Sequence, residues 1–220
     1  MIKPPLLFHR PFDHEDLAWC KAEFLPSDTT ELQHNDPTWG NVRVKLPSQL
    51  TRAVEKRRTE FLAGRLCAAY ALRQLGKAEE VGCHGRKPVW PVGVSGSITH
   101  TDQRAFSVAS ESALSLGVDC EPIMSASKAR EIWSLVLSEK EYALRPAHMS
   151  FAAFVTTIFA SKEAFYKAMS SFVDRMLEFH EVNLISIEDS NIDLLFEGSK
   201  YRLLWRKMDG DCLALCRLDI

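Results

Sequence analysis

The sequence predicts an α+β protein, and three stretches of the chain support that prediction. Apolar residues recur at helical spacing between Thr51 and Leu75, and a second, strongly apolar helix is predicted over residues 151–169. Short strand-like runs, VNLISI, IDLLF, YRLLWRK and CLALCRL, follow between Val182 and Ile220. A chain that combines long helices with groups of short strands is assigned to the α+β class.

Composition excludes several broad classes of protein. The chain has 220 residues, of which 46% are hydrophobic and 25% charged, so it can bury a core. No apolar run approaches the roughly 20 residues of a membrane-spanning helix, so no membrane span is expected. The N-terminal stretch has prolines and acids where a secretion signal needs an apolar run, so we expect a cytoplasmic protein. The six cysteines include no C-x-x-C pair, and neither a disulfide framework nor a structural zinc is predicted.

Charge is distributed unevenly along the chain. The net charge is −2, which argues against a protein that coats nucleic acid. Residues 1–40 carry three Lys and Arg against seven acids, whereas residues 52–87 carry nine Lys and Arg against four Glu, a net charge of +5. The second stretch is therefore suited to binding an anion.

The first half of the chain contains few other clear elements. We expect the first forty residues to be irregular and proline-rich, and VRVKLP at 42–47 to form a short strand. Gly76 stands where the first long helix should end. A loop containing Gly and Pro is predicted over residues 76–97.

The middle of the chain alternates strand and helix signals. Two β-like runs at 105–110 and 114–121 are joined by a short polar turn and are predicted to form a hairpin. Residues 127–145 are expected to contain one or two helical turns, with Ser138 and Glu141 at capping-box spacing.

Two acidic side chains end the predicted strand at 114–121. Asp119 and Glu121 are two residues apart, so the pleat points both carboxylates to one face. Oxygen ligands with no nearby His or Cys favour a hard ion such as Mg²⁺. A solvated strand end is the alternative, and for an Asp-x-Glu motif alone it is the commoner case.

A further acid lies on the second predicted helix. Glu163 and Lys167 are four residues apart there, a spacing that an ordinary surface ion pair shares. The helix is otherwise strongly apolar, so charges on it must be compensated if they are buried. A third carboxylate beside Asp119 and Glu121 would create a cluster of three negative charges, which requires a divalent ion and a neighbouring lysine such as Lys162 or Lys167.

Basic and small residues mark two other segments. Arg57 and Arg65 are eight residues apart, about two helical turns, and guanidinium groups suit phosphate, although most basic helices are simply solvated. Further on, Lys87 precedes a segment whose Gly and Ser residues permit close backbone approach to a ligand before His100. A lone histidine after a strand is more often structural.

In this order the four segments resemble the 4′-phosphopantetheinyl transferases, in particular the monomeric class of the surfactin-synthetase activator and enterobactin synthase component D type. The family usually has F-S-A-K-E where this chain has F-A-S-K-E, and Cys120 stands between the two acids; neither difference displaces an acid or a lysine. The matching segments are R-R-x-E-F-L-A-G-R (57–65), K-P-x-W-P-x-G-x-x-G-S-I-T-H (87–100), G-V-D-C-E-P (117–122) and F-A-S-K-E-A-F-Y-K-A (159–168).

The resemblance implies a fold and a reaction. The fold is a pseudo-dimer of two similar α+β halves in one chain, residues 1–115 and 116–220, with the active site in the cleft between them. The reaction, of the holo-[acyl-carrier-protein] synthase type, transfers the 4′-phosphopantetheine group of coenzyme A to a serine of an apo acyl, peptidyl or aryl carrier protein and releases adenosine 3′,5′-bisphosphate. A monomer that serves siderophore or secondary metabolite biosynthesis and binds no nucleic acid is implied.

The resemblance also implies the roles of individual residues. Asp119, Glu121 and Glu163 would hold Mg²⁺ together with the pyrophosphate of coenzyme A, and Glu163 would be the base for the carrier serine. Lys167 would steady charge on the pyrophosphate. The residues implied to bind coenzyme A are Arg57, Arg65, Lys87, Ser97, Thr99, His100, Lys162 and Lys167.

Two other functions fit parts of the sequence. Asp-x-Glu with a further Glu and Lys also describes Mg²⁺-dependent phosphoesterases and nucleases. A carrier-binding scaffold without chemistry is the alternative outside enzymes, and the presence of all three acids argues against it.

Overall fold

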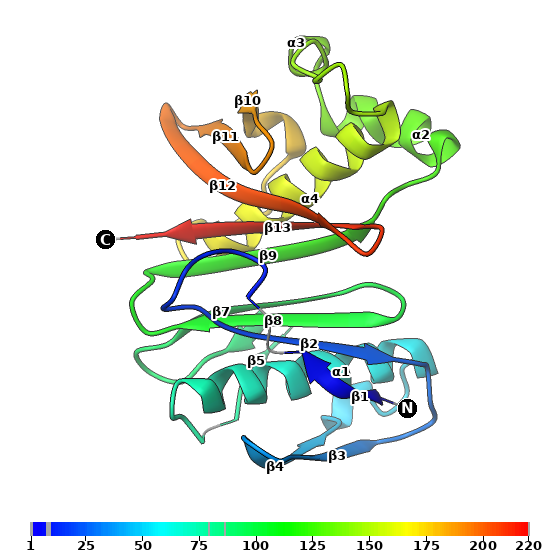
Figure 1. Cartoon of the computed structure of the whole chain (residues 1–220), viewed down its shortest axis with the longest axis vertical. Helices are drawn as coiled ribbons and strands as arrows, with labels where there is room; N and C mark the ends of the chain where they lie inside the picture. The colour runs from blue at the N-terminus through cyan, green and yellow to red at the C-terminus, as the bar shows by residue number, and fades with distance from the viewer. Residues whose placement is uncertain (1, 8–9, 79, 86, 220) are drawn as a thin grey trace. The chain divides into compact units, whose positions relative to one another are not determined.

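The computed structural model describes residues 2–7, 10–78, 80–85 and 87–219, and the chain divides into two compact units (Figure 1). The first unit runs from the N-terminus to Leu114 and the second from Ser115 to Leu218. Each contains a long helix packed on an antiparallel sheet, which confirms the predicted α+β class and the two similar halves that the resemblance implies. Of the helices described here, none is both long and apolar enough to cross a bilayer.

The first unit is built on a four-stranded sheet of order β1-β2-β8-β7, in which every neighbouring pair is antiparallel. Helix α1 packs against β2, β7 and β8 of this sheet, and two small hairpins, β3-β4 and β5-β6, complete the unit. Its elements are β1 (Ile2–Leu7), β2 (Ala18–Phe24), β3 (Glu31–Asp36), β4 (Gly40–Lys45), a 3-10 turn (Ser48–Leu50), α1 (Glu55–Gln74), β5 (Gly82–His84), β6 (Lys87–Val89), β7 (Ser95–His100) and β8 (Arg104–Ser110).

Helix α1 is shorter at its start than the sequence predicts. It begins at Glu55 rather than Thr51, because Val54 has extended dihedral angles and acts as the N-cap after the 3-10 turn. Its end is the predicted one: Gly76 has a φ of +71°, which glycine tolerates without strain. The amides of Gly76 and Lys77 donate to the carbonyls of Arg73 and Leu72, as in a Schellman motif.

Three expectations for the first unit are wrong. The first forty residues are not irregular, since they contain β1, β2 and β3, and β2 lies inside the sheet with all but one of its residues buried. The loop expected over 76–97 contains the β5-β6 hairpin and the start of β7. The runs at 105–110 and 114–121 do not form a hairpin, because β8 pairs with β2 and β7 whereas β9 pairs with β13.

The second unit is a five-stranded antiparallel sheet of order β10-β11-β12-β13-β9, with α4 packed on β9, β12 and β13. The four predicted C-terminal strands and the capping box are confirmed; in the latter, Ser138 N donates to Glu141 Oε2 at 2.7 Å. The elements are β9 (Ser115–Pro122), α2 (Ala126–Val136), α3 (Glu139–Tyr142), α4 (Phe151–Met169), a 3-10 turn (Phe179–Glu181), β10 (Asn183–Ile187), β11 (Asn191–Phe196), β12 (Ser199–Met208) and β13 (Asp211–Leu218).

Helix α4 touches β9 backbone to backbone at Gly117. A Cβ atom built on Gly117 would lie 1.8 Å from the carbonyl oxygen of Ala164 and 2.6 Å from the amide nitrogen of Ala168. Beside this contact, Ser115 Oγ donates to the carbonyl oxygen of Ala168 at 2.8 Å. Residue 117 must therefore be glycine for the helix to lie this close to the strand.

We expect Gly117→Ala to lower the free energy of unfolding by about 3 kcal/mol or more, because the added methyl group meets rigid backbone that must move away. Urea unfolding followed by circular dichroism measures the loss. Gly64→Ala is the matched control: its Cβ meets the end of the Ile98 side chain, Cγ2, at 2.8 Å. That variant should lose about 1 kcal/mol or less, since a side chain yields more easily than backbone and alanine favours the helix. Equal losses in the two variants would contradict this account.

Candidate active site

The strand β9 and the helix α4 bring acidic side chains and a lysine together in the second unit. Asp119, on β9, is 5% exposed, and Glu163, on α4, is half-buried. Lys167 Nζ lies 2.7 Å from Asp119 Oδ1 and donates to the carbonyl oxygen of Val118 at 2.8 Å. The predicted helical spacing of Glu163 and Lys167 is present, but the hydrogen-bonded ion pair of Lys167 is with Asp119 on the neighbouring strand.

The acids of this group repel one another. Burial and the charges of Asp119 and Glu163 raise the pKa of Glu121 to about 7, against the attraction of Lys167. Burial and the charge of Asp119 likewise raise the pKa of Glu163. Carboxylates that raise one another's pKa hold more negative charge than their surroundings compensate, and a cation relieves that excess.

The donor set fits Mg²⁺ in its chemistry, because carboxylate oxygens are the hard ligands that this ion prefers. Within the described residues, however, no three His, Cys, Asp or Glu side chains are already arranged as a metal site. The ammonium group of Lys167 supplies positive charge to Asp119 in this structure. A shared ion would therefore require the three carboxylates to turn toward one another, and the magnesium site stays a prediction.

Lys162 has a different role from the one expected. Its side chain is fully buried, and its Nζ donates to Glu141 Oε1 at 2.8 Å and to the carbonyl oxygens of Val136 and Phe179 at 2.8 and 2.9 Å. Consecutive residues of a helix point about 100° apart, so Lys162 faces the core while Glu163 does not. The expectation that Lys162 binds coenzyme A is corrected: its three donors are already used inside the unit.

The first unit contains a cavity of about 580 Å³ beside the basic helix. Three of the predicted binding residues, Arg57, Arg65 and His100, line it. The other lining residues come from α1, from β7, from the β5-β6 hairpin and from the segment before α1: Pro47, Gln49, Leu50, Glu60, Phe61, Gly64, Cys83, Gly85, Pro88 and Ile98.

Arg65 makes this cavity chemically suited to an anion. Its guanidinium lies over the Phe61 ring, 5.0 Å from the centroid, and only 8% of the residue is exposed. Burial lowers its pKa, and its Nε has no hydrogen-bond partner among the described residues. A buried donor on a charged group is costly when unsatisfied, so an anionic ligand would stabilise it.

A second cluster of charge lines the same cavity. Nη1 of Arg57 lies 3.3 Å from Nε2 of His100. Both atoms lie 3.7 Å from Oε2 of Glu60, which is buried on the same face of α1. Glu60 and Phe61 were missed in the sequence, although their spacing from Arg57 and Arg65 places all four on neighbouring turns of one helix face.

The remaining predicted binding residues do not line the cavity. Successive residues of a strand point to opposite faces, so Ile98 and His100 face the cavity from β7 while Ser97 and Thr99 point the other way. Lys87 is exposed at the start of β6, where the next residue, Pro88, lines the cavity. Ser97 and Thr99 are not among the residues that line this cavity, and their binding of coenzyme A stays a prediction.

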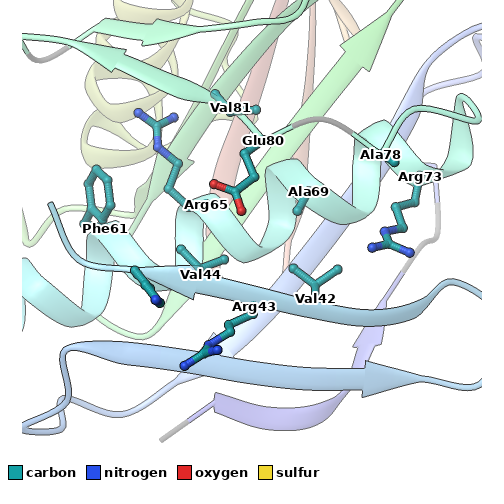
Figure 2. A pocket seen from close by; sticks show the side chains of 11 residues that line it. Val42, Arg43, Val44, Phe61, Arg65, Ala69, Arg73, Ala78, Glu80 and Val81 are labelled. Atoms are coloured by element: carbon teal, nitrogen blue, oxygen red, sulfur yellow. The ribbon is translucent and has the colours of Figure 1, made fainter.

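A second cavity, of about 430 Å³, lies along the same helix and is lined by α1, by β4 and by Ala78, Glu80 and Val81 (Figure 2). Two of the cations that line it have protein partners: Arg43 pairs with Glu31, and Arg73 donates to the carbonyl oxygens of Trp39 and Asn41. Arg65 lines this cavity as well as the first. Figure 2 shows the Arg65 guanidinium directed away from β4. We therefore assign the anion site to the first cavity.

An acidic group that suits a divalent ion and a cavity that suits a phosphate are features of an enzyme with an anionic, phosphate-bearing substrate. Family models match successive parts of the chain: the 4′-phosphopantetheinyl transferase N-terminal domain over residues 46–110, and the 4′-phosphopantetheinyl transferase superfamily over residues 115–216. The chain therefore belongs to the 4′-phosphopantetheinyl transferase superfamily. It is a transferase that uses coenzyme A and modifies carrier proteins, as the motifs imply.

Similar proteins support this assignment along most of the chain. Enterobactin synthase component D of Escherichia coli (strain K12) is 33% identical over 200 residues, which are 89% of this chain and 92% of the relative. The 4′-phosphopantetheinyl transferase PptT of Mycobacterium tuberculosis is 33% identical over 181 residues, 80% of this chain and 74% of the relative. The 4′-phosphopantetheinyl transferase Npt of Nocardia iowensis is 35% identical over 149 residues, 66% of each chain.

We expect Lys162→Met to lower the free energy of unfolding by about 3–5 kcal/mol, because it leaves the buried carboxylate of Glu141 without its cation. Urea unfolding at neutral pH measures the loss. The double variant Lys162→Met with Glu141→Gln should recover part of it, since no unpaired charge then remains in the core. A single variant as stable as the wild type would refute the buried pair.

Glu121 makes the stability of the metal-free protein depend on pH. Its pKa is about 7 in the folded chain and near 4.5 when unfolded, so between these values the folded state binds the extra proton. Stability should therefore fall as pH rises from 5 to 8, by about 1–2 kcal/mol after allowing for partial exposure.

Urea unfolding at a series of pH values in a chelator measures this slope. Glu121→Gln should flatten it, and should be more stable than the wild type at pH 8. Glu188→Gln, at an exposed position of the same unit, is the control and should keep the wild-type slope. An unchanged slope in Glu121→Gln would show that another group is responsible.

Proposed function

We propose that this enzyme is a Mg²⁺-dependent, holo-[acyl-carrier-protein] synthase type transferase that modifies a serine of an apo carrier protein. The single observation that supports its site most strongly is the acidic group of Asp119, Glu121 and Glu163 beside Lys167, held together by the contact of β9 with α4. Several relatives are named as enterobactin synthase components, which favours a carrier of siderophore or related secondary metabolite biosynthesis. We further propose that the enzyme is a cytoplasmic monomer.

The first unit would hold the nucleotide end of coenzyme A. Arg65 offers a buried guanidinium to the 3′-phosphate, and Arg57 and His100 offer further donors in the same cavity. Lys87, exposed on the neighbouring hairpin, can add positive charge at its rim. Binding energy gathered at this remote end orients the pyrophosphate, where the chemistry takes place.

The second unit would act on the pyrophosphate. Asp119, Glu121 and Glu163 would hold Mg²⁺, which when bound neutralises pyrophosphate charge and makes the β-phosphorus more open to attack. Lys167 is about one-third exposed and donates at the strand end, so it can also donate to a phosphate oxygen as charge develops there.

Glu163 is proposed as the group that takes the proton. The carrier serine attacks phosphorus, its hydroxyl proton passes to the Glu163 carboxylate directly or through a water molecule, and adenosine 3′,5′-bisphosphate leaves. The raised pKa of Glu163 makes it a better base than an ordinary carboxylate at neutral pH.

We expect an apo carrier protein incubated with enzyme, coenzyme A and Mg²⁺ to gain one phosphopantetheine group, seen by intact-mass spectrometry. Chelation of the metal should abolish the gain, and Asp119→Asn and Glu163→Gln should lower kcat by about 10²–10³-fold through loss of electrostatic stabilisation and of the base. Arg65→Met should mainly raise KM for coenzyme A.

Asp189→Asn is the matched control, because Asp189 is a nearly fully exposed acid of the same unit and should leave turnover unchanged. Full activity in Asp119→Asn would remove the metal-site proposal. Mg²⁺-dependent degradation of DNA or RNA without any mass gain would favour the nuclease alternative, and carrier binding without a mass gain would favour a scaffold.

A further inference from the structure

One cysteine of this chain differs from the others in its surroundings. Cys83 is exposed, whereas the other five cysteines are buried. It lies on β5, lines the cavity that contains Arg57, Arg65 and His100, and its Sγ donates to the carbonyl oxygen of Gly85 at 3.0 Å. A reagent that enters this cavity therefore meets an accessible thiol.

Arg65 makes the cavity attractive to an anionic reagent. Its Nε has no hydrogen-bond partner among the described residues, and only 8% of the residue is exposed. Burial lowers the pKa of Arg65, whereas the interaction with Cys83 acts to raise it. Arg65 and Cys83 line the same cavity, so their side chains are within interaction range. The guanidinium can hold an anion next to the sulfur.

We propose that Cys83 is a thiol-modification site that reacts with anionic low-molecular-weight disulfides and thereby closes the cavity to coenzyme A. The Cys83 sulfur, as thiolate, attacks one sulfur of the disulfide, whose S–S bond breaks. A new S–S bond joins Cys83 to one half, and the other half leaves as a thiolate that takes up the proton released by Cys83. The disulfide is the oxidant, and a reduced thiol reverses the step.

The consequence for coenzyme A rests on the proposed function of this cavity. An anionic group attached to Cys83 would occupy part of the 580 Å³ space and supply a carboxylate to the cations that line it. Coenzyme A would then have less space in the cavity and fewer cations with which to pair. We expect its affinity to fall by about tenfold or more, as for the loss of one or two charge-assisted hydrogen bonds.

Glutathione disulfide is the anionic probe, and cystamine, which is cationic, is the comparison. We expect peptide mapping of the folded protein to place the modification on Cys83, with glutathione disulfide favoured over cystamine at low salt and the preference reduced at high salt. Coenzyme A should slow the reaction. The matched control is Cys83→Ser with Ser199→Cys, which presents a thiol on β12 of the second unit; it should show neither the preference nor the protection.

Calorimetric titration of coenzyme A then links modification to binding. The modified wild-type protein should bind it about tenfold more weakly and recover after reduction, whereas the affinity of Cys83→Ser should not respond to the disulfide. Unmodified Cys83, or a modified protein with unchanged affinity, would overturn the inference. If untreated protein does not bind coenzyme A at all, the proposed function of the cavity fails instead, even where Cys83 still reacts selectively.

Discussion

The contact between β9 and α4 at Gly117 is the constraint on which the second unit depends. Strand and helix meet backbone to backbone, with a carbonyl of the helix where a side chain would otherwise lie. Two residues further along β9 comes Asp119, and Lys167, one turn from Ala164 on α4, reaches it. Asp119 and Lys167 lie on different elements. The close approach of these elements, which the missing Cβ atom of Gly117 allows, brings the two charges within hydrogen-bond distance.

Two lysines of α4 show how position on a helix decides the role of a charge. Lys162 faces inward, where Glu141 and two carbonyl oxygens take its protons, so it joins α4 to the end of α2 and to α3. Lys167 faces the strand end and remains partly exposed, so its charge stays available beside the acids. The same residue type thus stabilises the fold at one position and, in the proposed function, donates to the pyrophosphate at the other.

The sequence predicted what depends on local spacing. Both long helices, the C-terminal strands, the capping box of Ser138 and the acids of β9 follow from periodicity or short motifs. The prediction from sequence failed where a distant segment determines the structure. Strand β2 is buried on both faces and so lacks the alternation of polar and apolar residues that marks a strand. Strand β9 pairs with β13, nearly a hundred residues later, instead of β8. The inward direction of Lys162 likewise depends on Glu141, which no spacing rule connects to it.

Glu60 has a consequence for how tightly the cavity of the first unit can hold its ligand. Its carboxylate lies 3.7 Å from Arg57 and from His100, so the protein carries its own anion among the groups that would grip a phosphate. A phosphate that enters the cavity would compete with the Glu60 carboxylate for Arg57 and His100, and the negative charge of Glu60 would cancel part of its attraction to them. If this cavity holds the nucleotide end of coenzyme A as proposed, the same carboxylate would also promote release of the nucleotide product, so the arrangement would favour repeated turnover over tight retention.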